Sequence, residues 1–115
     1  MKIKILNNIA KEGLDIFDLN GFQIVNEDPN PSGIVLRSHD LTKLQIPKTL
    51  LGIARAGAGT NNINIDECSS YGVVVFNTPG ANANAVKELV ICGMLLSSRG
   101  IIEGIDLSEL CITSK

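Results

Sequence analysis

The sequence is poor in aromatic residues and has no long apolar segment. Its 115 residues are 44% hydrophobic, yet only 3% are aromatic and none is tryptophan. The longest apolar stretch, residues 89–96, is well short of the ~20 residues that span a bilayer. The opening MKIKILNNIA has too short an apolar run for a secretory signal. We therefore expect a soluble, cytoplasmic protein with no membrane partner.

Cysteine, histidine and clustered positive charge are also scarce. The three cysteines, Cys68, Cys92 and Cys111, are widely separated and show no zinc-binding spacing. This pattern favours reduced thiols and predicts no metal site. The formal net charge is -2, and no stretch gathers several lysines or arginines. These features argue against nucleic acid as a partner.

Five short apolar stretches within residues 1–80 have the length of strands. They cover residues 3–6, 22–25, 34–36, 50–54 and 73–76, and helical patterns separate several of them. Strands that alternate with helices predict a parallel sheet, and five of them suggest a flavodoxin-like, doubly wound α/β domain. The last stretch is apolar throughout, as expected of a strand that is covered on both faces. The second and third strands are too close for a crossover helix, so we expect an irregular loop between them.

Capping and stop signals locate the helices between these strands. Asn7 or Asn8 would cap the first helix, which Asn20-Gly21 would end. Asn64 opens a capping-box pattern for a second helix. Residues 41–44 have the composition of a single helical turn.

Residues 81–98 form a helical pattern that is apolar on every side. Leu89 lies on one face, and Ile91 and Leu95 lie on another. A helix that is apolar all round must be covered all round, and a small five-stranded domain covers only one side. We therefore expect a second domain or another subunit to cover the rest, with self-association through residues 82–98.

Arg55 ends the fourth strand and opens a glycine-rich loop. Ligands of open α/β sheets bind at the carboxyl ends of the strands, where glycines let backbone N–H groups approach an anion. Gly57-Ala58-Gly59 supplies the first half of a dinucleotide fingerprint, but Asn62 occupies the position of the third glycine. We therefore reject this loop as a Rossmann turn. An anion-binding loop and a plain glycine turn both fit the pattern.

Arg37 and His39 follow the third strand, at the same expected edge of the sheet. Arg37 and Arg55 would converge there on one anion, or both would be solvated surface residues. His39 has no nucleophile with a supporting acid in the sequence. No pair of carboxylates suggests a general acid and base. We therefore interpret His39 as a structural residue or at most as part of a pocket wall.

Several separated motifs in the right order resemble one family. The Arg55-Ala56-Gly57-Ala58-Gly59 loop, the earlier Leu36-Arg37-Ser38-His39 and the later Asn77-Thr78-Pro79-Gly80 are similar to the N-terminal domain of D-isomer-specific 2-hydroxyacid dehydrogenases. The residues of these motifs are most similar to those of the phosphoglycerate dehydrogenases of that family. The resemblance extends to about Ile105, and residues 106–115 depart from it.

The resemblance implies a substrate site and a cofactor. Substrate would be a small anionic 2-hydroxy acid, and the cofactor of the whole enzyme would be NAD. Arg37, Arg55, Ala56, Gly57 and Asn77 match positions that surround the substrate. Ala58 matches the position that touches the nicotinamide side of the cofactor.

The resemblance also implies an organisation into three parts. Residues 1–80 would be the flavodoxin-like substrate-side domain, residues 81–105 an interdomain helix and residues 106–115 a divergent tail. The Rossmann domain, with the family's catalytic histidine, glutamate and arginine, is absent from this chain. We therefore expect the substrate-side domain of an NAD-dependent phosphoglycerate dehydrogenase, truncated and inactive alone. The alternative is a non-catalytic module that binds anions or associates with itself.

Overall fold

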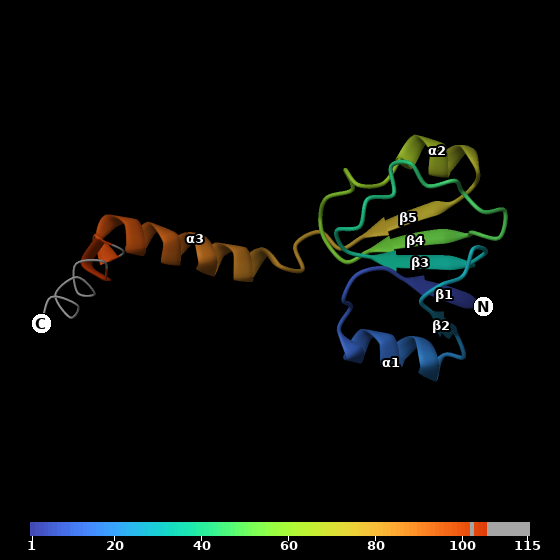
Figure 1. Ribbon diagram of the computed structural model, residues 1–115, viewed down its shortest axis with the longest axis horizontal. Coiled ribbons are helices and arrows are strands. Elements are labelled where there is room, and N and C mark those ends of the chain that lie inside the picture. The colour runs from blue at the N-terminus through green and yellow to red at the C-terminus, as the bar shows by residue number, and fades with distance from the viewer. Residues whose placement is uncertain (102, 106–115) are drawn as a thin grey trace, which may run out of the picture. The chain divides into compact units, whose positions relative to one another are not determined.

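The computed structural model describes residues 1–101 and 103–105 of the chain (Figure 1). Contacts divide the chain into two compact units, Met1–Ala81 and Asn82–Lys115. The expected tail, residues 106–115, lies outside the described residues. The elements in chain order are β1 (Lys2–Ile5), α1 (Lys11–Leu19), β2 (Gln23–Val25), β3 (Gly33–Leu36), β4 (Gly52–Arg55), α2 (Ile65–Ser70), β5 (Val74–Asn77) and α3 (Ala83–Ser98).

The first unit is built on a parallel sheet of the predicted kind. Its strand order is β2-β1-β3-β4-β5, and every adjacent pair is parallel. This is the strand order of flavodoxin-like doubly wound domains, so the predicted fold is confirmed. The short connection from β2 to β3 contains no helix, as expected.

The main core lies between one face of the sheet and α2. Ile34, Leu36 and Ile53 point to that face and are almost fully buried. They pack with Cys68 of α2 and with apolar residues of the loops, Leu41, Leu50, Ile63 and Val73. Because side chains alternate along a strand, the neighbouring residues of β3 and β4 face the other way. Helix α1 lies on that opposite side, near β1 and β2 (Figure 1).

The opposite face of the sheet is only partly covered. Val74 of β5 is 48% exposed, and Phe76 is 61% exposed. The expectation that this strand is covered on both faces is therefore wrong for the described residues. The reason is that the β3–β4 connection and helix α2 both pack on the core face of the sheet, so neither covers β3, β4 and β5 on this side.

The sequence signals for the ends of helices agree with the structure more often than the signals for their starts. Gly21 follows α1 with a φ of 74°, and Gly72 follows α2 with a φ of 71°, both in the left-handed region that favours glycine. Asn64 caps α2 by accepting from the N–H of Glu67 at 3.2 Å. The predicted cap of α1 is wrong, because its N-cap is Ala10 and no side chain caps it.

The segment 41–44 is a turn and not the predicted turn of helix. The carboxylate of Asp40 accepts from both the N–H and the hydroxyl of Thr42, which fixes the start of the turn. Leu41 pairs with Ile63 in an isolated parallel bridge, and its N–H donates to the carbonyl of Asn62 at 2.8 Å, so a distant part of the chain holds this segment.

The second unit contains α3, which begins one residue after its N-cap, Asn82. None of its side chains is buried, and Leu89 is 73% exposed. Residues 101 and 103–105 are also helical. Among the described residues, no helix has both the length and the apolar character needed to cross a membrane.

Candidate functional site

The carboxyl ends of three neighbouring strands meet at one edge of the sheet. Leu36 of β3 is in register with Arg55 of β4, which is in register with Asn77 of β5. Arg37 and the loop that follows Arg55 therefore begin at the same edge. The structure thus brings together every residue that the sequence indicated for the substrate and the cofactor.

Arg55 ties two loops at this edge together. Its Nε donates to the carbonyl of Arg37 at 2.9 Å, and its Nη1 donates to the carbonyl of Gly59. A Cβ atom at Gly57 would lie 3.3 Å from Nη1, and one at Gly59 would lie 3.1 Å from it. The guanidinium group therefore rests directly on the glycine-rich loop, where side chains would crowd it.

Asn77 joins the same loop to the end of β5. Its Nδ2 donates to the carbonyl of Ala58 at 2.7 Å. The N–H of Thr78 donates to the carbonyl of Gly57 at 3.0 Å. The side chain of Asn77 thus holds the protein backbone, and its Oδ1 is the atom left for other partners.

Two asparagines that the sequence did not indicate hold the loop after β3. The Oδ1 of Asn7 accepts from the N–H groups of residues 37, 38 and 39, at 3.2, 3.0 and 2.9 Å. The Nδ2 of Asn62 donates to the carbonyl of His39 at 2.7 Å. The Oδ1 of Asn62 is buried without a hydrogen-bond partner. An asparagine soon after a strand is the sequence signal that could have indicated this role for Asn7, because asparagine tolerates the left-handed backbone conformation.

Only some donors at this edge remain available to a ligand. The N–H of Ala56 donates to Leu36 and that of Gly57 donates to Arg55, at 2.8 and 2.9 Å. Within residues 1–101, no hydrogen bond uses the N–H of Ala58, that of Gly59, or the exposed guanidinium of Arg37. One exposed cation and two amide donors beside Arg55 form an arrangement suited to a small anion.

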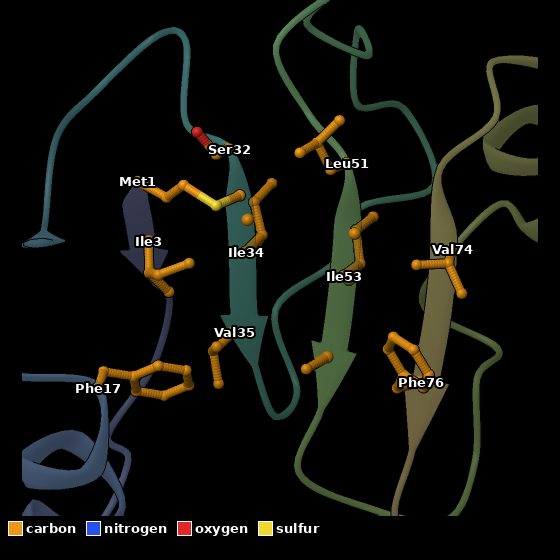
Figure 2. A pocket seen from close by; sticks show the side chains of 13 residues that line it. Met1, Ile3, Phe17, Ser32, Ile34, Val35, Leu51, Ile53, Val74 and Phe76 are labelled. Carbon is orange, nitrogen blue, oxygen red and sulfur yellow. The ribbon is translucent and has the colours of Figure 1, made fainter. Parts of the chain in front are cut away.

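An apolar hollow of the first unit opens on a face of the sheet and not at this edge. It is an open depression of about 240 Å³ on the uncovered face of the sheet, between Phe17 of α1 and Phe76 of β5 (Figure 2). Val35 and Val74 also line it, and so does the polar residue Ser32. Such a surface offers little to a charged substrate, so the chemistry of the site favours the carboxyl edge.

The glycine-rich loop does not fit the pyrophosphate of a dinucleotide. The guanidinium of Arg55 occupies the space beside Gly57 and Gly59, and α2 begins only at Ile65. Dinucleotide sites instead place the phosphate at the start of a helix directly after the loop. No cluster of three or more potential metal ligands occurs among the residues that the structure describes.

Comparison with known proteins identifies the family. The pattern described as "D-isomer specific 2-hydroxyacid dehydrogenase, catalytic domain" matches residues 5–104. The chain therefore belongs to the D-isomer-specific 2-hydroxyacid dehydrogenase family.

The similar relatives include several phosphoglycerate dehydrogenases. The chain is 33% identical to D-3-phosphoglycerate dehydrogenase of Archaeoglobus fulgidus, over 88% of this chain and 22% of the relative. It is 32% identical to D-3-phosphoglycerate dehydrogenase 1 of Saccharomyces cerevisiae, over 86% of this chain and 24% of the relative. The NAD+-bound structure of 3-phosphoglycerate dehydrogenase from Entamoeba histolytica matches with a TM-score of 0.72 and 28% identity, over 84% of this chain and 38% of that one. The chain thus spans about a quarter of the length of these two curated relatives.

Proposed function

We propose that this chain is the substrate-side domain of an NAD-dependent D-3-phosphoglycerate dehydrogenase. The supporting observation is the carboxyl edge of the sheet, where Arg37, Arg55 and the N–H groups of Ala58 and Gly59 lie together. In the whole enzyme, 3-phospho-D-glycerate is oxidised to 3-phosphohydroxypyruvate. The role of this domain is to hold the anionic groups of the substrate.

The arginines divide this task. Arg55 is already bound to two carbonyls, so it contributes positive potential and the one remaining nitrogen, Nη2. Arg37 is exposed and contributes a full guanidinium fork, which suits a phosphate or carboxylate. Ala56, Gly57 and Asn77 shape the loop around the anion. Ala58 is exposed at this edge and is the residue proposed to face the nicotinamide.

We further propose that the 115-residue polypeptide alone does not catalyse the reaction. It contains no G-x-G-x-x-G sequence, and its glycine-rich loop is filled by Arg55. Without a held hydride acceptor, the positioning that accelerates such a reaction is missing. Steady NADH consumption with 3-phosphohydroxypyruvate that depends on this polypeptide would contradict this proposal.

Anion binding can be tested on the chain itself. We expect 3-phosphoglycerate to shift the amide NMR signals of Ala58 and Gly59, and glycerate to bind more weakly because it lacks the phosphate. Arg37→Ala should weaken binding roughly 10-fold, as expected from the loss of one charge-assisted hydrogen bond. Lys48→Ala is the matched control, because Lys48 is an exposed cation that precedes the amino end of β4. If both variants lost the same affinity for 3-phosphoglycerate, the loss would reflect net charge alone, and the proposed site would be refuted.

Self-association is a second candidate function, supported by α3. Leu89 is 73% exposed and Met94 is 66% exposed on a helix without a buried residue. Apolar surface of this extent favours association. Light scattering after size exclusion should give a dimer or larger species, and Leu89→Lys with Met94→Lys should give a monomer. A wild-type monomer at high concentration would refute this function.

We also propose that the protein is cytoplasmic. Cys68 and Cys92 are both free thiols, which fits a reducing compartment.

A further inference from the structure

Asn7 is the one residue other than glycine with a positive φ in the part of the chain that the structure describes. Its φ is 72°, in the left-handed region that costs most residues energy. It lies just after β1, the strand next to β3 in the sheet. Neither the capping role expected from the sequence nor the proposed function accounts for this conformation.

The side chain of Asn7 gathers three consecutive backbone donors. Its Oδ1 lies 3.2 Å from the nitrogen of Arg37, 3.0 Å from that of Ser38 and 2.9 Å from that of His39. Successive N–H groups that converge in this way form a concave site of the kind that binds anions. Here an amide oxygen of the protein occupies it, so the loop is folded around Asn7.

The carbonyl groups of the same loop are held from the other side. The carbonyl of Arg37 accepts from Arg55 at 2.9 Å, and that of His39 accepts from Asn62 at 2.7 Å. With donors and acceptors both engaged, the backbone of residues 37–39 has little freedom, while its three side chains remain exposed. A rigid loop backbone fixes the point from which the exposed side chain of Arg37 starts.

We propose that Asn7 is a positioning residue for the anion site, acting through the loop that carries Arg37. Its left-handed backbone places Oδ1 at the centre of the loop, and the three hydrogen bonds fix the direction in which Arg37 leaves the sheet. The inference rests on the proposed function, since the anion is the phosphate or carboxylate of the substrate.

Two substitutions separate the acceptor of Asn7 from its backbone conformation. Asn7→Gly keeps the positive φ without strain but removes Oδ1, whereas Asn7→Asp keeps an oxygen acceptor and a residue type that tolerates this φ. Asn8→Gly is the matched control, because Asn8 is the exposed neighbour of Asn7. Circular dichroism and thermal unfolding establish that each variant is folded.

Amide hydrogen exchange reports the loop, and a titration with 3-phosphoglycerate reports the site. In Asn7→Gly we expect exchange at residues 37–39 to accelerate at least about 10-fold and the Kd for 3-phosphoglycerate to rise about 10-fold. Asn7→Asp should restore slow exchange, although its added negative charge also weakens anion binding. Asn8→Gly should match the wild type in both measurements.

The outcomes that overturn the inference are distinct from the one that overturns the function. Unchanged exchange in Asn7→Gly, or faster exchange with an unchanged Kd, refutes positioning by Asn7 while the site stands. Fast loop exchange in a folded Asn7→Asp refutes it as well, and this arm decides the matter if Asn7→Gly does not fold. A wild-type chain that binds neither 3-phosphoglycerate nor inorganic phosphate refutes the proposed function, and with it the site that Asn7 would serve.

Discussion

Replacement of Arg55 by lysine distinguishes a residue that braces two loops from one that only supplies positive charge. Lysine keeps the charge but replaces the planar fork by a single nitrogen. The native guanidinium donates from Nε to the carbonyl of Arg37, in the loop after β3, and from Nη1 to the carbonyl of Gly59, in the loop after β4. A lysine ammonium at this position reaches at most one of these carbonyls, so at least one loop is released.

The expected loss of stability follows from these two hydrogen bonds. Arg55 is only partly buried, so we take roughly 0.5–1 kcal/mol for each bond and ~1–2 kcal/mol for the pair. A domain the size of the first unit is typically stable by ~4–12 kcal/mol. Arg55→Lys should therefore remain folded, with a lower midpoint of urea unfolding.

Urea unfolding and amide exchange together provide the assay. We expect a lower midpoint and faster exchange at Thr78, whose N–H donates to the carbonyl of Gly57 at 3.0 Å in the same loop. Arg99→Lys is the matched control, because Arg99 is an exposed arginine of the second unit. An unchanged midpoint with unchanged exchange at Thr78 would refute the bracing role and leave Arg55 as a simple cation.

Two further predictions concern Cys68 and Asp28. Burial, with a smaller contribution from the charge of Glu67, raises the pKa of the Cys68 thiol, so in single-cysteine variants it should react with a thiol reagent at least about 100-fold more slowly than Cys92. Equal rates would show that Cys68 of α2 is not packed against the sheet. The Lys2 ammonium, 2.8 Å from the carboxylate, and the N–H of Asn30 lower the pKa of Asp28. A carboxyl with a lowered folded pKa stabilises the fold above its unfolded pKa and loses that contribution as pH falls through its folded pKa. Asp28→Asn should therefore lower the urea midpoint more at about pH 6 than at about pH 2.5. An equal decrease at both values would contradict the ion pair.

Much of the fold could be predicted because its signals are local. Short apolar runs separated by helical patterns specify parallel strands, and Gly21 and Gly72 mark the ends of helices by their positive φ. The uncovered face of β5 could not be predicted in this way. Val74 and Phe76 have the composition of a buried strand, and their exposure depends on which connections elsewhere form helices.

The meeting of the candidate residues at one edge could be predicted, but the hydrogen bonds among them could not. Arg37 and Arg55 could be placed at one edge because parallel strands end together. The hydrogen bond from Arg55 to the backbone of Arg37 depends on how two loops fold against each other. The hydrogen bonds that Asn7 accepts join residues 30 to 32 positions apart in the sequence. No local pattern distinguishes an asparagine that holds a distant loop from one that caps a helix.

Substitutions on the two faces of the sheet should change the free energy of unfolding by very different amounts. Leu36 is 0% exposed, and truncation to alanine removes three buried carbons at ~0.8 kcal/mol each and leaves a cavity, so we expect a loss of ~3–4 kcal/mol. Phe76 is 61% exposed on the other face, and Phe76→Thr keeps a residue suited to a strand, so the expected change is within ~1 kcal/mol.

The same pair of variants tests whether the apolar hollow is open in solution. Phe76 forms one wall of that hollow, so Phe76→Thr should reduce the binding of a hydrophobic dye such as ANS (Figure 2). Leu36 does not line the hollow and should not contribute to dye binding. If Phe76→Thr instead destabilised the chain as much as Leu36→Ala, the hollow would have to be covered in solution. The face would then be covered by another part of this chain or by another molecule, because apolar side chains on a sheet gain that much stability only from burial.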